Sequence, residues 1–170
     1  MFDYKEHFNA FCKENNLCIN LSFDMPAGYE SANGTFDDET KTVYINAEAL
    51  WDAPDHEKAF YLFHELRHAM QYLCPGQFSE AVRRSLQYVI QYDGTCYKRI
   101  NGAYRACRLD GGEKRFADLY LAQPHETDAN AFAYERTKRL FGDSAALRKL
   151  YTFWTPERHV WCRNMTRSLR

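Results

Sequence analysis

The sequence lacks the features that mark several classes of protein. It has no hydrophobic run long enough to span a bilayer, and its beginning, MFDYKEHFNAFCKENN, contains acids but no apolar segment of signal-peptide length. None of its six cysteines forms a CxxC pair, which argues against a cysteine-based zinc knuckle. The sequence therefore predicts a cytoplasmic protein with reduced thiols and no membrane partner.

No internal repeat, low-complexity segment or linker divides the chain. Its 170 residues suit one domain, and a hydrophobic content of 45%, with 16% aromatic residues, suffices for a core. We therefore expect residues 1–170 to form a single domain.

The net charge of −1 is unevenly distributed along the chain. Residues 1–57 carry twelve acidic and three basic residues, whereas residues 58–170 carry nineteen basic and eleven acidic residues. The simplest explanation of this division is that the two halves attract each other or that their charged residues face solvent. It also provides a basic surface on which an anionic partner can bind.

Hydrophobic periodicity predicts a mainly helical chain with a few strands. Apolar spacings of three and four predict helices over 3–15, 55–73, 79–92, 124–141 and 144–153. Alternation predicts strands over 18–23 and in both halves of GTFDDETKTVYIN, residues 34–46. Residues 93–123 show only two short amphipathic pieces. We expect an α+β fold in which a small antiparallel or mixed sheet packs on a mainly helical body.

The helix expected at 55–73 contains HELRH, in which His64 and His68 are four residues apart and Glu65 follows the first. Residues four apart share one face of a helix, so both imidazoles can bind one ion. Zinc in catalytic sites keeps an open position for water, and Glu65 is well placed to take a proton from that water. The HExxH pattern is typical of zinc peptidases. The alternative is a pair of helix histidines with ordinary polar partners.

A catalytic zinc needs a third protein ligand, and the helix expected at 124–141 is its best source. Glu126 lies in the first turn, and Asn130, one turn later, would share its face and orient a ligand histidine. The small residues Ala129 and Ala133 would let the two helices approach closely. Both helices, the HExxH helix and the Glu-bearing helix, would therefore hold one ion.

Other residues of the chain are weaker candidates for the third ligand. Asp128 is the second choice, and His125 and His159 come after it. Without the two histidines of HELRH, Glu126 itself would be read as an acid that complements the helix dipole.

HELRH together with ETDANAFA, residues 126–133, resembles the glutamate zincins, in which a downstream ExxAN or ExxAD helix completes HExxH. The chain is most similar to the ImmA/IrrE-like metallopeptidases of bacteria and their mobile elements. These share a strand ending in IN (VYIN, 43–46), a HELxH helix and an E-x-[DE]-A-N-x-F-A segment, so the similarity covers about residues 30–75 and 120–141. The resemblance implies His64, His68 and Glu126 as zinc ligands and Glu65 as the general base.

The chain departs from this family in one respect. Fifty-seven residues separate His68 from Glu126, which is more than these small peptidases usually have. The extra segment, about 77–120, would be a lid, a substrate-selecting wall or an additional helical pair.

The resemblance implies a zinc-dependent endopeptidase that cleaves a protein or peptide substrate, such as a repressor or a host factor. One alternative is a catalytically inactive zinc-binding regulatory module. Another is a nucleic-acid-binding module, which the six basic residues within 98–115, interleaved with Tyr97 and Tyr104, would favour.

Two further expectations concern the substrate. The strand TVYIN, residues 42–46, would lie at a sheet edge and pair with the substrate backbone, unless it is an interior strand. A side chain near the metal should stabilise the oxyanion that forms during hydrolysis. The candidates for this role are Tyr120, Tyr134, His159 and Arg67.

Overall fold

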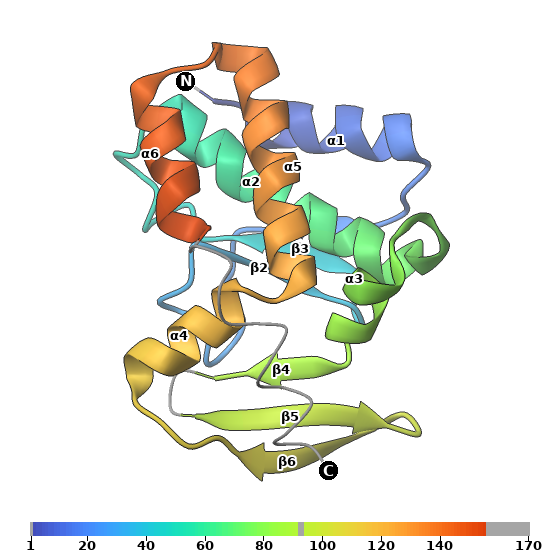
Figure 1. Ribbon diagram of the computed structural model, residues 1–170. Coiled ribbons are helices and arrows are strands. Elements are labelled where there is room, and N and C mark those ends of the chain that lie inside the picture. The colour runs from blue at the N-terminus through green and yellow to red at the C-terminus, as the bar shows by residue number, and fades with distance from the viewer. Residues whose placement is uncertain (1, 92–93, 156–170) are drawn as a thin grey trace.

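A computed structural model describes residues 2–91 and 94–155, and its elements are shown in Figure 1. The helices are α1 (Tyr4–Asn15), α2 (Asp55–Leu73), the 3-10 helix η1 (Pro75–Gln77), α3 (Glu80–Ser85), α4 (Glu113–Leu121), α5 (Pro124–Phe141) and α6 (Ala145–Trp154). The strands are β1 (Asn20–Ser22), β2 (Gly34–Asp37), β3 (Thr42–Ile45), β4 (Tyr88–Ile90), β5 (Thr95–Ile100) and β6 (Ala103–Arg108). Two small sheets on a helical body confirm the expected α+β class.

The first sheet, sheet A, is mixed and has the strand order β1-β3-β2. β1 runs parallel to β3, with Leu21 opposite Val43, and β2 runs antiparallel to it, with Phe36 opposite Val43. Of the two alternatives for the TVYIN strand, the sheet edge is therefore wrong and the interior strand is confirmed. β3 is central because it has partners on both sides, and Val43 and Ile45 are fully buried accordingly. Within the described chain, the edge strands of sheet A are β1 and β2.

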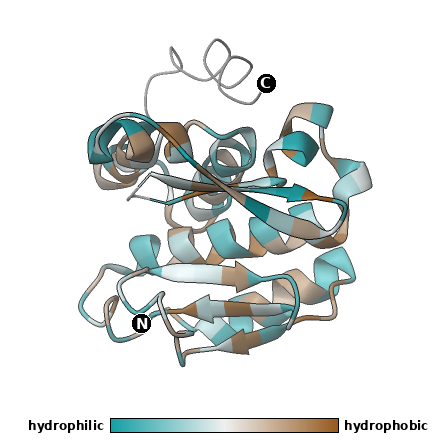
Figure 2. Ribbon diagram, turned by 90° about the horizontal axis from the view of Figure 1, so that it is seen from below, coloured by the Kyte–Doolittle hydropathy of each residue, from teal (hydrophilic) through white to brown (hydrophobic). Residues whose placement is uncertain are grey.

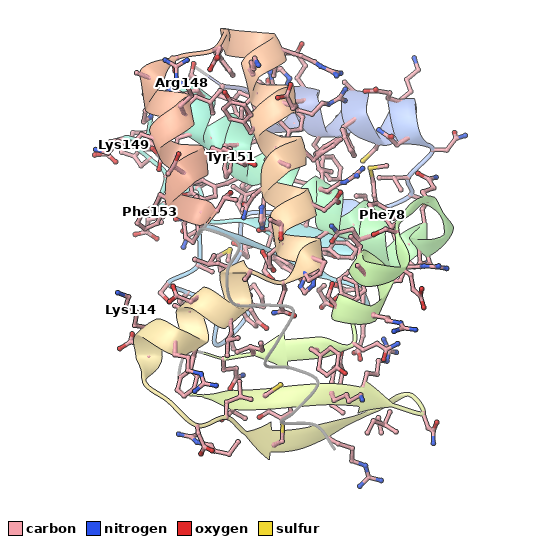
Figure 3. The ribbon with its side chains drawn as sticks, viewed as in Figure 1. Phe78, Lys114, Arg148, Lys149, Tyr151 and Phe153 are labelled. Atoms are coloured by element: carbon pink, nitrogen blue, oxygen red, sulfur yellow. The ribbon has the colours of Figure 1, made fainter. Side chains whose placement is uncertain are left out.

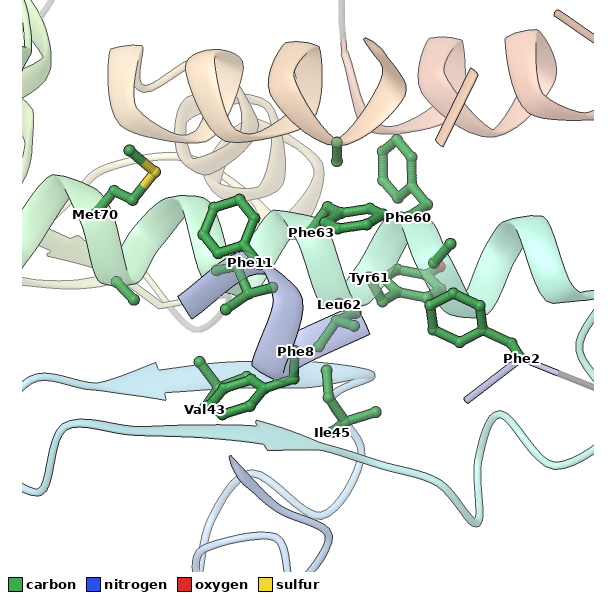
Figure 4. Packing of buried hydrophobic residues seen from close by; sticks show 14 of the residues in the cluster. Phe2, Phe8, Phe11, Val43, Ile45, Phe60, Tyr61, Leu62, Phe63 and Met70 are labelled. Atoms are coloured by element: carbon green, nitrogen blue, oxygen red, sulfur yellow. The ribbon is translucent and has the colours of Figure 1, made fainter. Parts of the chain in front are cut away.

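Helix α2 runs between α5 and sheet A, as Figure 4 shows. Its residues Phe60, Leu62 and Leu66 are almost completely buried, and they belong to the largest hydrophobic cluster. A helix that is apolar on most sides is stable only when other elements cover it, and burying each such side chain contributes about 1.5–3 kcal/mol. Ala129 and Ala133 of α5 are fully buried, so the small residues do allow the close approach expected of them.

The limits of α2 and α5 agree with the expected ranges. Pro124 occupies the first position of α5, where its missing N–H leaves no helical hydrogen bond unmade. Gly142 ends the helix with a positive φ of 80°, which glycine adopts without strain because it has no Cβ. Because Pro124 sets where α5 begins, it places Glu126 in the first turn of this helix.

Within the helix expected at 79–92, the described residues 79–91 do not form a single helix. The short helix α3 is followed by β4, in which Val89 and Ile90 pair antiparallel with Tyr97 and Cys96 of β5. The apolar spacing fitted a helix, but β-branched residues also suit a pleated strand whenever a partner strand is available. Tertiary pairing has therefore overridden the helical pattern.

The second sheet, sheet B, has the strand order β4-β5-β6. β5 and β6 are joined by Asn101 and Gly102, whose positive φ values of 52° and 80° match the tight turn that two-residue hairpins favour. Phe116 of α4 packs against Cys96 in a second small core. The extra segment of about 77–120 therefore contains a three-stranded sheet as well as helices.

Hydrophobic and hydrophilic residues alternate around the outer helices, as Figure 2 shows. This pattern is expected where one side of a helix packs on a core and the other meets water. No helix within residues 2–91 and 94–155 combines the length and the apolar content that crossing a membrane requires.

Candidate metal centre

The packing of α2 on the first turn of α5 brings His64, His68 and Glu126 together. The His64 Nε2 and His68 Nε2 atoms are 3.0 Å apart. Glu126 Oε2 lies 3.4 Å from His64 Nε2, and Glu126 Oε1 lies 3.5 Å from His68 Nε2. One ligand atom from each residue therefore lies within 4.8 Å of the others, and this group can hold a metal ion.

These distances fit the geometry of a small tetrahedral cation. With metal–ligand bonds of about 2.0–2.1 Å, two ligands of a tetrahedral ion are about 3.3–3.4 Å apart. The two imidazole nitrogens are 3.0 Å apart, and each lies 3.4 or 3.5 Å from a different oxygen of the Glu126 carboxylate, so the separations lie around this value. The two nitrogens and the carboxylate would supply three protein ligands.

Gln71 holds the ring of His68 in the orientation that a ligand needs. Its Oε1 lies 2.8 Å from His68 Nδ1, and its Nε2 donates to the carbonyl oxygen of His125 at 2.9 Å and to Asp128 Oδ2 at 2.9 Å. Because the Gln71 amide nitrogen is used as a donor, the Gln71 oxygen is left to accept a hydrogen bond from the N–H at His68 Nδ1. With Nδ1–H donating to Gln71, the Nε2 atom of His68 faces Glu126 and His64 and is the atom that a metal ion would bind in place of a proton.

Asp128 is not a ligand in this structure, although it was the second choice from the sequence. Arg67 donates to both of its carboxylate oxygens, with distances of 2.7 Å to Oδ2 and 3.1 Å to Oδ1. The Arg67 guanidinium also lies over the rings of Phe78 and Phe132, at 4.5 and 4.6 Å from their centroids. The pair therefore joins α2 to α5 beside the metal centre, and Arg67 is committed to this pair rather than to an oxyanion.

The expected role of Asn130 is also wrong. Its side chain is buried, and its Nδ2 donates to the carbonyl oxygen of Trp154 at 2.8 Å, whereas no hydrogen bond joins it to His64 or His68 among the described residues. Asn130 thereby fixes the end of α6 against α5. The role assigned to it belongs to Gln71, which lies one turn after His68 on the same helix.

His125 lies beside the Glu126 carboxylate. Its Nε2 lies 3.4 Å from Glu126 Oε1, and Ser85 Oγ lies 2.9 Å from its Nδ1 and accepts from its backbone N–H at 3.1 Å. Burial lowers the pKa of His125, which favours the neutral ring. His125 does not belong to the group of mutually close ligand atoms, so it is a neighbour of the carboxylate rather than a fourth ligand.

Glu65 is buried beside the two ligand histidines. Burial raises its pKa, and the nearby Glu126 carboxylate raises it further, while His64 and His68 act in the opposite direction. A Cβ at Gly34 would come within 2.8 Å of Glu65 Cγ, so the start of β2 leaves space for this side chain only because residue 34 is glycine. The carboxylate is therefore held between β2 and the metal ligands.

His68 and Glu126 shift each other's pKa in opposite directions, which favours a protonated ring beside an ionised carboxylate. Burial alone would lower the pKa of His68, but the Glu126 carboxylate raises it to about 9. Although burial alone would raise the pKa of Glu126, the surrounding histidines hold it well below its ordinary value. A protonated His68 thus supplies the positive charge that Glu126 needs, and a metal cation can replace that proton.

No side chain orients His64 as Gln71 orients His68, because the buried Nδ1 of His64 has no hydrogen-bond partner among the described residues.

The other residues expected to stabilise an oxyanion lie elsewhere. Tyr134 donates to Asp143 at 2.8 Å, near the C-terminal end of α5. Tyr120 packs beside the small core under sheet B. His159 lies outside the described residues.

The chain has no significant match among protein-family models, curated proteins or solved structures. What can be said of its function therefore depends on the geometry of the site and on the motifs that the residues form.

Proposed function

We propose that this protein is a zinc-dependent endopeptidase of the ImmA/IrrE-like kind. His64, His68 and Glu126 would hold the zinc, and Glu65 would be the general base. The observation that carries the proposal is the convergence of two imidazole nitrogens and one buried carboxylate, with a second buried carboxylate directly beside them. Two nitrogens and one oxygen form a ligand set that zinc accepts in hydrolytic enzymes.

Bound zinc would lower the pKa of its water from about 15.7 to about 7 and polarise the substrate carbonyl. The side chains of the protein supply the remaining steps. Glu65 accepts a proton from the attacking water and later delivers it to the leaving amine. The raised pKa of Glu65 suits both transfers. A carboxyl group of ordinary pKa would take the proton from water less readily and would hold it too weakly to deliver it to the amine.

The free edge of β2 is the best place for the substrate backbone. No backbone hydrogen bond joins this edge to another described residue, and its first residue, Gly34, lies against Glu65. An extended peptide that pairs with β2 would bring its backbone past the general base. The strand expected to pair with the substrate backbone was β3, and this proposal gives that role to its neighbour β2.

We place the activity in the cytoplasm, because the cysteines of the described chain are free thiols. A protein such as a repressor or a host factor would be the substrate. A regulatory zinc protein without activity would have no use for a buried acid in the position of Glu65, since that acid costs free energy through burial.

The substitution Glu65→Gln tests this function directly. It keeps the size of the side chain and all three ligands, so zinc should remain bound, whereas cleavage should fall by about 10²–10⁴-fold because the base is lost. Cleavage is measured by mass spectrometry of new peptide termini in a peptide pool. Normal cleavage by the zinc-loaded variant would show that Glu65 is not the base.

A further inference from the structure

Two contacts between α2 and β2 align this strand with the proposed active site. A Cβ on Gly34, at the start of β2, would lie 2.8 Å from Glu65 Cγ and 3.2 Å from Glu65 Oε1. Two residues later, the ring of Phe36 contacts that of Tyr72, with the centroids 6.0 Å apart. α2 and β2 therefore run in the same direction, with the proposed general base at the start of β2 and Tyr72 near its end.

Gly34 and Phe36 lie on the face of sheet A that α2 covers. Successive side chains of a strand point to opposite faces, so residues two apart share a face. Their partners in β3 are Ile45 and Val43, which are fully buried in the main hydrophobic core. Thr35, between them in β2, points to the opposite face. The α2 face of β2 is thus polar at Gly34, where the carboxylate lies, and apolar at Phe36.

Tyr72 lies on the side of α2 that carries the proposed catalytic groups. It follows Glu65 by seven residues and His68 by four, so the three side chains lie on adjoining parts of one helix face. Side chains of a helix lean towards its N-terminus, which brings the phenol towards His68. The side chains of Tyr72 and Phe36 are only partly buried. Both rings therefore keep surface that a ligand can cover.

The β5–β6 hairpin adds a third aromatic side chain beside the end of β2. Arg99 and Tyr104 are directly opposite in the register, so they share one face of sheet B. Arg99 Nη1 lies 3.6 Å from Asp38 Oδ2, in the turn after β2, and the guanidinium lies 5.8 Å from the Tyr104 ring centroid. Burial raises the pKa of Tyr72, and the charge of Tyr104 raises it further, so the two phenols are within electrostatic reach. Tyr104, which is 47% exposed, therefore borders the same region.

An extended peptide that pairs with the free edge of β2 would continue the alternation of sheet A. Its residues opposite Gly34 and Phe36 would both point to the α2 face, since directly opposite side chains share a face, with Cβ atoms about 4.5–5.5 Å apart. The first would lie beside Glu65 and carry the carbonyl that is attacked. The second would lie beside the rings of Phe36 and Tyr72. Antiparallel pairing is the more stable arrangement, and it places the second residue before the first in the peptide.

From this register we infer that Phe36 and Tyr72 form a subsite that selects peptide substrates with an apolar side chain two residues before the residue whose carbonyl is attacked. The inference rests on the proposed peptidase function and names what its substrate must carry. Tyr104 borders the subsite on the side of sheet B. Specificity thus depends on two rings that belong neither to the metal ligands nor to the general base.

An apolar side chain suits this position better than a charged one. Moving apolar surface out of water is favourable, whereas a charge placed beside two rings loses hydration without gaining an ion pair. Arg99 already pairs with Asp38, and the other acids of that turn, Asp37 and Glu39, would repel a substrate carboxylate. An aromatic ring can also bind a cation, so enrichment of Lys or Arg is the competing result in the test.

The test uses zinc-loaded wild-type protein and a pool of random peptides of about twelve residues, long enough to extend past both ends of β2. The cut sites are read by mass spectrometry of the new termini. We expect apolar residues to be enriched about tenfold two residues before the attacked carbonyl, and less at the positions on either side, whose side chains point to the opposite face. An even distribution of residue types at this position, or enrichment of Lys or Arg there, overturns the inference. So does an apolar preference found only after the cut.

Substitutions on the two faces of β2 show which residues select. Phe36→Ala and Tyr72→Ala should each remove most of the enrichment, whereas Tyr72→Phe keeps the ring and should retain it. Thr35→Ala is the matched control, because Thr35 lies on the same strand but on the opposite face. Unchanged enrichment in Phe36→Ala and Tyr72→Ala, or its loss in Thr35→Ala or Tyr72→Phe, overturns the inference. Zinc content and circular dichroism show whether each variant is folded.

Phe153→Ala controls for peptides that bind any exposed aromatic side chain. Phe153 lies on α6 and is 69% exposed (Figure 3). This variant should keep the enrichment. Its loss in Phe153→Ala would place the apolar contact on α6 and overturn the inference.

Binding to the zinc-loaded Glu65→Gln protein separates this inference from the proposed function. The variant keeps both rings and all three ligands, so the immobilised protein should retain peptides enriched in apolar residues, and adding Tyr72→Ala should abolish the enrichment. This result without cleavage by the wild type would leave the subsite standing and overturn the peptidase function. Cleavage without a preference at the expected position would leave the function standing and overturn the inference.

Discussion

At the scale of single residues, Gln71 determines how His68 presents its ring. The fully buried amide uses both ends, since it accepts from the imidazole and donates to two oxygens of α5. A buried amide with every group paired is rigid, because any rotation would leave a polar group without a partner. The orientation of this candidate metal ligand is therefore set by a residue that lies outside the ligand group.

We predict that Gln71→Met weakens zinc binding about 10–100-fold, as loss of a ligand's supporting hydrogen bond typically does. Methionine keeps the length of the side chain but cannot accept from His68 in the same way. The dissociation constant is measured by competition with a chromogenic chelator. The control is Gln77→Met, because Gln77 is exposed in η1. Wild-type affinity in Gln71→Met would refute the role of Gln71.

The raised pKa of His68 gives zinc binding a definite pH dependence. Below a pH of about 9 the metal-free site holds a proton on His68, and zinc must displace it. Affinity for zinc should therefore rise about tenfold per pH unit between neutral pH and 9, and the rise should flatten above that value. Chelator-buffered titrations check the slope, and calorimetry in two buffers counts the protons released. A zinc affinity that does not change with pH across this range would contradict a protonated His68 in the metal-free protein.

At the scale of elements, the metal centre depends on the contact between α2 and α5. Arg67 and Asp128 join the two helices by a two-pronged ion pair in a partly buried position. Gln71 adds a third hydrogen bond to the same carboxylate. Removing Asp128 would leave a guanidinium and an amide without their partner inside the helix interface.

We expect Asp128→Ala to lower the free energy of unfolding by about 1–3 kcal/mol, measured by urea denaturation. The three proposed ligands remain, so the variant should still bind zinc. Asp143→Ala is the comparison, because Asp143 forms an exposed ion pair with Arg148 and its loss should cost less than about 1 kcal/mol. Equal losses in both variants would show that the Asp128 pair contributes no more than a surface pair.

The elements differ in how well the sequence predicts them. α2 and α5 have long apolar stripes and clear terminal signals, such as Pro124 and Gly142, so their limits follow from local chemistry. The spacing of Val89 and Ile90 fits a helix, and these residues form a strand only because they pair with β5. Likewise, nothing in TVYIN indicates that β1 would pair on its second side. Contacts between distant segments are the information that local patterns lack.

The candidate site shows the same division. His64 and His68 were predictable because their spacing alone places them on one helix face, and Glu126 because it begins the later helix. The sequence did not predict that Gln71, and not Asn130, orients His68, because this depends on how α5 is rotated against α2. The position of Gln71, three residues after His68, was the one available signal, since residues at this spacing are neighbours on a helix.

At the scale of the whole molecule, the site lies where three layers meet: α5, α2 and sheet A. The acidic first part of the chain supplies β2 and its turn, and the basic later part supplies sheet B. Their contact at Asp38 and Arg99 is one place where the two charge-rich regions attract each other. The uneven charge of the sequence therefore has a partly structural explanation.

The central claim is that three side chains from two helices bind one metal ion, and elemental analysis of the purified protein tests it most directly. Mass spectrometry of the metals should find about one zinc ion per chain in the wild type and in Asp128→Ala, and little in Glu126→Ala. Wild-type protein that binds no transition metal after incubation with zinc would contradict the account. Full zinc content in Glu126→Ala would contradict it as well.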